Sequence, residues 1–229
     1  MRPITVVLCV VLIGLAGCQW NREPIEDIAA EAPENVTVLL ANPYVRVAEF
    51  RLAPGEGLPL HVGGPRLVYS LSTYSFLWKE SGKETELQWS PGEVHWHEAM
   101  PHEVLNVGTT EAHYLIVTRL GEPLPEGAAD VEEDVADASP KYGKVVFAND
   151  IVRLVQVTLP SGESIPMHDG RPRAIYALTD YALEFEEEGG QKSLTEFKTG
   201  QAVFHGRGRH AVRNTGNTDA RYLVFGLRK

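Results

Sequence analysis

The stretch PGEGLPLHVGGPR, residues 54–66, returns later in the chain as SGESIPMHDGRPR, residues 161–173. Both copies carry a Gly-Glu turn signal, a proline two residues before a histidine, and a closing Gly-x-Pro-Arg. After one extra residue in the second copy, the matched positions are Gly92, His97, His102, Asn106 and Gly108 with Gly200, His205, His210, Asn214 and Gly216. A chain that matches itself at a fixed offset contains a duplicated structural unit. We therefore predict two related domains in tandem.

Each copy shows the pattern of short β-strands. Residues 45–50 and 181–185 alternate apolar and polar side chains, and residues 67–71 and 114–118 are compact apolar runs. Pro-Gly, Ser-Gly and Gly-Gly dipeptides separate these runs. Short strands at about ten-residue intervals, without a convincing long helix, are typical of a sandwich or a barrel. The predicted fold class is therefore all-β.

The histidine pattern resembles the two motifs of the cupin superfamily. The second motif, a glycine followed by His-x-x-x-Asn, is matched in both copies by Gly92, His102 and Asn106 and by Gly200, His210 and Asn214. The first motif, a glycine, His-x-His and then a glutamate, is half present. Its glycine and first histidine are Gly55 and His61 in one copy and Gly162 and His168 in the other, whereas Gly63 and Gly170 replace the second histidine and Val68 and Ile175 fall near the glutamate position. The resemblance implies two tandem cupin-type double-stranded β-helix (jelly-roll) barrels, at residues 35–120 and 141–229.

A complete cupin site binds a divalent metal through three imidazoles and one carboxylate, a set that suits Fe, Mn, Ni, Cu or Zn. Here one imidazole and the carboxylate are missing from each copy, and two neutral ligands alone make a weak site. A third histidine that also matches between the copies could compensate. The predicted metal ligands are thus His61, His97 and His102 in the first copy and His168, His205 and His210 in the second. In the alternative interpretation His97 and His205 cap a loop, and the other four bond to backbone.

Arg66 and Arg173 each follow a proline and precede an apolar run. Near the histidine strand they are predicted to line the barrel mouth, where a guanidinium binds a carboxylate or phosphate with two parallel hydrogen bonds. The alternative is an ion pair with a glutamate at the end of the barrel.

Other polar and aromatic residues receive structural predictions. The solvent face of the first strand is predicted for Arg46 and Arg153, the core for Tyr69 and Tyr176, a turn for Asn106 and Asn214, and a surface or packing role for His95 and His113. Asparagine is common in turns because its side chain bonds nearby backbone.

The N-terminus indicates export. Residues 1–17 combine Arg2 with an apolar run and are predicted to be a signal peptide. The ending Leu15-Ala16-Gly17-Cys18 resembles the lipobox of bacterial lipoproteins, which implies cleavage before Cys18 and acylation of that cysteine. The alternatives are an ordinary signal peptide and a transmembrane helix that contains a cysteine by chance. Because Gln19 is not an aspartate, the prediction favours the periplasm-facing surface of the outer membrane in a Gram-negative cell. Residues 18–34 are predicted to be a polar tether, and residues 121–140 an acidic, solvated linker.

The function classes follow from charge and from the altered motif. A formal net charge of −10 argues against nucleic acid as a partner. The first hypothesis is a lipid-anchored envelope protein that binds a small polar or anionic ligand, with or without a divalent metal. The second is a bicupin metalloenzyme of the dioxygenase, decarboxylase or isomerase type. The third is a structural envelope lipoprotein without a ligand. Sequence leaves open whether the chain forms a homo-oligomer.

Overall fold

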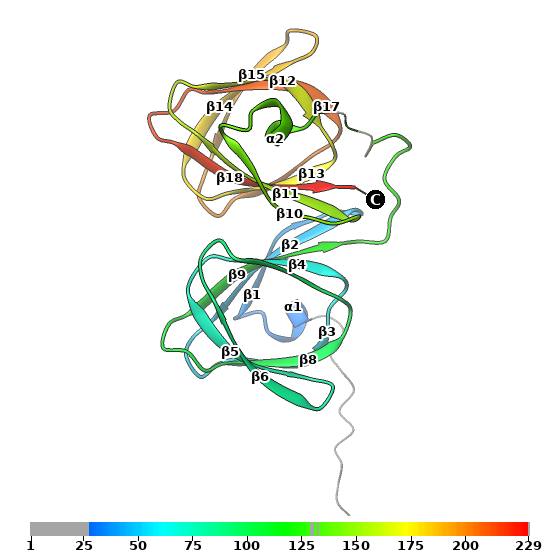
Figure 1. Ribbon diagram of the computed structural model, residues 1–229, viewed down its shortest axis with the longest axis vertical. Helices are drawn as coiled ribbons and strands as arrows, with labels where there is room; N and C mark the ends of the chain where they lie inside the picture. Colours follow the sequence, from blue (N-terminus) through cyan, green and yellow to red (C-terminus); the bar gives the residue numbers. More distant parts are fainter. Residues whose placement is uncertain (1–27, 129–130, 132, 229) are drawn as a thin grey trace, which may run out of the picture.

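Two β-barrels lie one above the other in this computed structural model (Figure 1). The structure describes residues 28–128, 131 and 133–228, and within them the chain forms eighteen strands and two four-residue helices. The predicted all-β class, with two tandem cupin-type jelly-roll barrels, is confirmed. Residues 1–27 lie outside the described residues, and with them the predicted signal peptide, Cys18 and most of the predicted tether.

Each barrel is made of a five-stranded sheet that faces a four-stranded sheet, and all neighbouring strands are antiparallel. In the N-terminal barrel the larger sheet has the order β1 (Val36–Ala41), β2 (Val45–Leu52), β9 (Ala112–Arg119), β4 (Arg66–Ser70), β7 (Val94–His97). The smaller sheet has the order β3 (Gly57–Val62), β8 (Pro101–Asn106), β5 (Tyr74–Glu80), β6 (Lys83–Trp89).

The C-terminal barrel repeats this plan strand for strand. Its larger sheet has the order β10 (Gly143–Ala148), β11 (Val152–Leu159), β18 (Ala220–Leu227), β13 (Arg173–Ala177), β16 (Ala202–His205). Its smaller sheet has the order β12 (Ser164–Gly170), β17 (Gly208–Asn214), β14 (Tyr181–Glu187), β15 (Lys192–Phe197). Register irregularities also recur, between Leu58 and His61 and between Ile165 and His168. The duplication read from the sequence is therefore present in the backbone itself.

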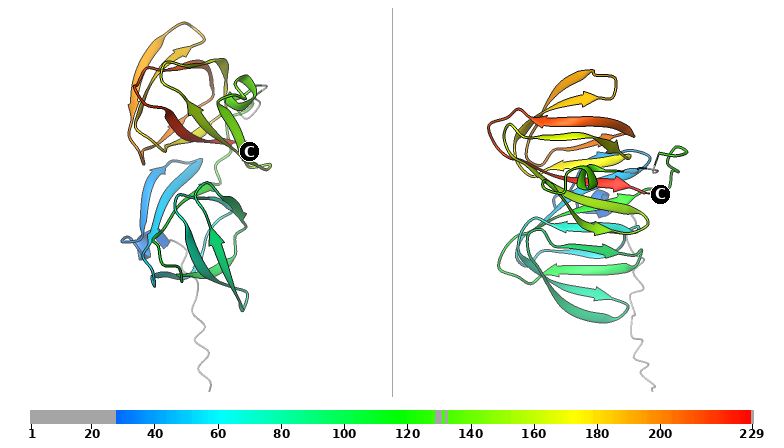
Figure 2. Two further views of the ribbon diagram at one scale, coloured as in Figure 1. Left: turned by 60° about the vertical axis from the view of Figure 1, so that its left-hand side comes forward. Right: turned by 45° about the horizontal axis from the view of Figure 1, so that its top comes forward.

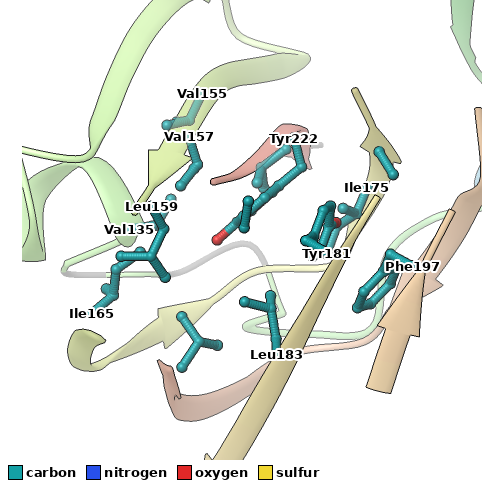
Figure 3. Close-up of a cluster of buried hydrophobic side chains, with 14 of the residues drawn as sticks. Val135, Val155, Val157, Leu159, Ile165, Ile175, Tyr181, Leu183, Phe197 and Tyr222 are labelled. Carbon is teal, nitrogen blue, oxygen red and sulfur yellow. The ribbon is translucent and has the colours of Figure 1, made fainter. Parts of the chain in front are cut away.

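Alternation along the strands of the larger sheets separates two cores. Ala48 and Phe50 of β2 point into the N-terminal barrel, whereas Val45 and Val47 point away from it. Successive side chains of a strand face opposite sides of the sheet, so one strand can serve both cores. Figure 3 shows the corresponding interior of the C-terminal barrel, where Val155, Val157 and Leu159 of β11 pack with aromatic side chains such as Tyr181 and Phe197.

The outward faces of the two larger sheets pack on each other. Leu67 and Leu115 of the first barrel join Leu154, Leu223 and Phe225 of the second in one buried cluster. Two aromatic stacks cross the boundary, Tyr44 with Phe204 at 5.9 Å and Trp96 with Phe147 at 6.2 Å between ring centroids. The predicted core residues Tyr69 and Tyr176 are buried here, between the barrels. The views in Figure 2 show the two barrels in contact along these sheets.

A short helix packs against each barrel, and both helices correct the predicted boundaries. Helix α1 (Ile28–Glu31) belongs to the stretch predicted as tether, and Ala32 just after it is buried in the N-terminal core. Helix α2 (Val135–Ala138) belongs to the predicted solvated linker, yet Val135 and Ala136 are buried in the C-terminal core. Four residues are too few to show a helical period in sequence, which is why composition alone suggested a spacer. Neither helix approaches the length or apolar character of a membrane span, and none elsewhere in the described residues does.

Candidate ligand-binding site

The matched histidines meet inside each barrel. His61 on β3 and His102 on β8 are register partners, and their ring centroids are 4.2 Å apart. His168 on β12 and His210 on β17 repeat the pair at 4.4 Å. All but His210 are almost fully buried. The structure thus brings together the first and third predicted ligands of each set.

Backbone carbonyls fix the tautomers of these rings. The Nδ1–H of His61 donates to the carbonyl oxygen of Pro59 at 2.8 Å, and the Nδ1–H of His102 donates to that of Met100 at 2.9 Å. A carbonyl oxygen can only accept, so the proton of each ring lies on Nδ1. The Nε2 lone pair is therefore the one that faces the barrel interior.

In each barrel an arginine donates a hydrogen bond to the Nε2 lone pair of one histidine. Arg66 on β4 is 3% exposed, and its Nη2 donates to Nε2 of His102 at 2.9 Å. Arg173 on β13 is 7% exposed, and its Nη2 donates to Nε2 of His210 at 3.2 Å. Because a guanidinium has no acceptor, each of these imidazoles must be neutral.

Burial also favours the neutral form of these imidazoles. It lowers the pKa of His102 and of His210 to about 3, with His61, His168 and the arginines adding to the effect. Burial also lowers the pKa of Arg173 to about 10, so Arg173 remains a cation at neutral pH. The predicted alternative, an ion pair between these arginines and a glutamate, is not formed among the described residues. Each barrel therefore contains a buried guanidinium that forms no ion pair in the described chain, although the more distant charge of Glu80 acts on Arg66.

The remaining predicted ligands lie against aromatic rings. Trp78 stacks on His97 at 4.6 Å and on His102 at 4.3 Å between centroids. In the other barrel Phe185 takes the place of Trp78 and lies 6.0 Å from His205. Burial lowers the pKa of both His97 and His205 to about 4. These two histidines are packing partners of the pocket wall rather than loop caps.

The N-terminal barrel contains one more histidine than predicted for its interior. His95 lies two residues before His97 on β7, stacks on Trp89 at 3.8 Å, and lines the same interior. The predicted packing role of His95 thus holds, but the sequence analysis missed that it lies in the barrel interior beside His97. The His-x-His spacing could have shown this, because alternate residues of a strand lie on one face. Among the described residues, Nδ1 of His95 and Nε2 of His97 are buried without a hydrogen-bond partner. His113 lies elsewhere and pairs with Glu49.

The residues present do not fit the metal that the cupin resemblance implies. No group of three or more His, Cys, Asp or Glu residues in the described chain is arranged to hold a metal ion. The physical reason is local, because Nη2 of Arg66 already uses the lone pair with which His102 would coordinate. Val68 is apolar where the family has a carboxylate, and Gly63 has no side chain where the family has an imidazole. The geometry therefore does not support the predicted three-histidine sites.

Room for a ligand lies at the barrel mouths. The interiors leave cavities of about 20 Å³ in the N-terminal barrel and about 40 Å³ in the C-terminal barrel, enough for a water molecule or two. The N-terminal mouth holds a cavity of about 310 Å³ that is lined by His61, Gly63 and Arg66. The C-terminal mouth holds about 470 Å³, lined by Arg173, His205 and His210 together with Glu187 and Glu188. Such volumes are those of small-molecule sites.

Two predictions for the first strands are wrong, and two for turns are confirmed. Arg46 and Arg153 face the barrel end rather than open solvent, because they share the inward face of β2 and β11 with Ala48 and Val155. Asp134, which the sequence analysis missed, pairs with Nε of Arg153 at 2.8 Å and caps α2. The Nδ2 group of Asn106 donates to the carbonyls of Leu52 and Thr110, and Asn214 makes the same two bonds to its counterparts.

Two jelly-roll barrels in one chain, each with its histidine pair on matching strands of the smaller sheet, define the bicupin fold. Solved structures agree. AerE from Microcystis aeruginosa has a TM-score of 0.56 and 19% identity, over 85% of this chain and 98% of that chain. An oxalate decarboxylase of Bacillus subtilis has a TM-score of 0.59 and 13% identity, over 88% of this chain and 71% of that chain. The Lactobacillus farciminis oxalate decarboxylase in its formate complex has a TM-score of 0.56 and 13% identity, over 87% and 80%.

At these identities the likeness establishes the fold alone. No family sequence model matches the chain, and no curated protein matches it in sequence. The Mn(II) centres described for the Bacillus subtilis oxalate decarboxylase belong to that protein.

Proposed function

We propose that this protein is a bicupin module that binds a small organic anion at the barrel mouth through a buried arginine. The observation that supports this most directly is Arg66, a nearly fully buried cation that lines the N-terminal cavity. A buried charge is costly unless an opposite charge compensates it, so an anionic ligand would stabilise this site. Arg173 also lines a cavity at the C-terminal mouth, but Glu187 and Glu188 line that cavity too, so the proposal rests mainly on the N-terminal barrel.

A carboxylate is the ligand group that fits best. The guanidinium is planar and presents parallel N–H donors, which match the two oxygens of a carboxylate. His61 beside Arg66 is neutral, because burial lowers its pKa, and it adds a polar contact without a competing negative charge. The apolar wall, with Ala48, Phe50 and Ile116, favours a ligand with a short carbon skeleton.

A thermal-shift experiment tests this proposal. The chain from residue 19 is melted with oxalate, malonate, succinate, citrate or glucuronate, with glucose and sodium chloride of equal ionic strength as controls. A ligand at 100 times its Kd adds about 2.7 kcal/mol, which raises Tm by about 5–10 °C in a protein of this size.

The variants Arg66→Gln and Arg173→Gln should each remove the shift that arises from their own barrel, each measured against its own Tm. The matched control is Arg51→Gln, because Arg51 is an exposed cation already paired with Glu49 and Glu111. If none of the anions moves Tm, or if the shift survives in the double variant, the proposal is wrong and a structural role is favoured.

We further propose that Cys18 carries the lipid anchor and that the barrels face the periplasm from the outer membrane, as the sequence of residues 15–19 suggests. Two or more acyl chains hold a protein far more firmly than one. Cells fed an alkyne-labelled fatty acid should label the wild-type chain in the membrane fraction, and Cys18→Ser should be unlabelled and released. An unlabelled wild-type chain would contradict the anchor.

A further inference from the structure

Gly63, the glycine at the position of the missing second histidine, lies against the guanidinium of Arg66. A Cβ atom added to Gly63 would lie 2.7 Å from Nη1 and 3.0 Å from Cζ of Arg66. Carbon atoms in favourable contact are about 3.5–4.0 Å apart, so a side chain at residue 63 and the present position of Arg66 are incompatible. The guanidinium thus lies in the space that the second histidine of the motif would need.

The C-terminal barrel repeats the arrangement with different neighbours. A Cβ atom on Gly170 would lie 2.7 Å from Cζ of Arg173 and 2.9 Å from Cε1 of His210. In addition, Arg66 donates to Nε2 of His102, and Arg173 donates to Nε2 of His210. The same coupled departure, a missing imidazole and an inward arginine, is therefore present twice in one chain.

We propose that Arg66 and Arg173 are resident cations that take the place of the metal in each barrel, and that Gly63 and Gly170 are the partners that make room for them. The guanidinium lies where an ion would have to bind, since a metal coordinates imidazole nitrogen at about 2.0–2.1 Å and Nη2 holds that lone pair at 2.9 Å. Its positive charge also repels a divalent cation at short range in a site of low dielectric constant. This inference concerns metal exclusion and does not require the anion binding proposed above.

The inference predicts that a metal site appears when the arginine is removed. Once Arg66 is shortened, Nε2 of His102 is released beside His61, with their ring centroids 4.2 Å apart and His97 on the same aromatic wall. The variants are Arg66→Ala, Arg173→Ala and their combination. Calorimetric titration of each with Ni²⁺ alone and with Zn²⁺ alone at pH 7.5 measures stoichiometry and affinity.

Each single variant should bind the ion at least about tenfold more tightly than the wild type, at one site per altered barrel, and the double variant at two. Adding His102→Ala to Arg66→Ala should abolish the gained site, which places the ion at the histidine pair. Arg51→Ala, which removes an exposed cation outside the barrel, should leave the titration unchanged.

A second variant guards against misfolding. Arg66→Gln keeps most of the side-chain volume without the charge, and circular dichroism with a melting curve confirms that each protein is folded. A wild-type chain that binds one ion per barrel as tightly as the variants would overturn the inference, and so would folded Ala and Gln variants that gain no affinity. The anion screen is run with a chelator present, so its outcome does not depend on metal binding. The failure of the anion-binding proposal is therefore distinguishable from the failure of the metal-exclusion proposal.

Discussion

A guanidinium and an imidazole can share a hydrogen bond only while the imidazole is neutral, because each would otherwise bring a donor and a positive charge. At the scale of single residues this pairing decides what the pocket can hold. Arg66 and His102 form one such pair, and Arg173 and His210 form the other. The side chains that a metal would need are present in part, but the Nε2 lone pairs of His102 and His210 are already in use.

The substitution Gly63→Ala tests the close contact with Arg66 in the absence of any ligand. The new methyl group forces the guanidinium away from His102, which should cost about 1–3 kcal/mol of the free energy of unfolding. In an Arg66→Ala background the same substitution should cost much less, because nothing then occupies that space. Urea denaturation of the four proteins gives the coupling energy, and additive effects would contradict the contact.

At the scale of elements, helix α2 is held in place by the residue that caps its N-terminus rather than by its length. Asp134 precedes α2, accepts a hydrogen bond from the backbone N–H of Ala136, and pairs with Arg153 on β11. A carboxylate at a helix N-terminus is favourable in itself, and here it also fixes the helix onto the barrel. This explains how a segment of acidic composition is ordered rather than solvated.

Replacing that carboxylate should release α2. Asp134→Asn removes the charge opposite the largely buried Arg153 and should cost about 3 kcal/mol of the free energy of unfolding. Asp137→Asn, at an exposed position that pairs with the same arginine, should cost less than about 1 kcal/mol. Chemical denaturation compares the two, and equal losses would mean that Asp134 acts as an ordinary surface charge.

The sequence predicted the elements that repeat and missed those that depend on tertiary contact. The paired histidines, the asparagine turns and the duplicated strands follow from period and spacing within one copy. The inward direction of Arg46 could not be predicted in this way. Strand β2 is largely buried on both faces, so its sequence does not indicate which face is exposed to solvent. Likewise, the spacing of His61, His97 and His102 suggested three ligands, and only the structure shows that Arg66 uses the Nε2 lone pair of His102.

At the scale of the whole molecule, most of its imidazoles are kept neutral inside the barrels. Burial lowers the pKa of His95, His102 and His210 to about 3 and that of His97 and His205 to about 4, against about 6.5 in an unfolded chain. Between pH 6.5 and 4 the unfolded chain therefore binds more protons than the folded one, and stability falls as the pH falls. Each histidine contributes up to about 1.4 kcal/mol per pH unit.

We therefore expect the urea midpoint to fall steeply from pH 7 to pH 5. His95→Val, which copies the residue at the matched position Val203, should make the dependence shallower by the share of one histidine. A midpoint that is constant over this range would show that the imidazoles are solvated, contrary to their burial.

The apolar seam between the two larger sheets has a consequence for the stability of this architecture. Trp96 and Phe204 occupy matched positions, and each stacks on an aromatic ring of the other barrel, as expected when two copies of one unit meet about an approximate twofold axis. A single barrel of this kind would expose that apolar sheet face, and a second identical chain would cover it. In one polypeptide the contact between the two barrels is intramolecular, so its stability does not depend on the protein concentration.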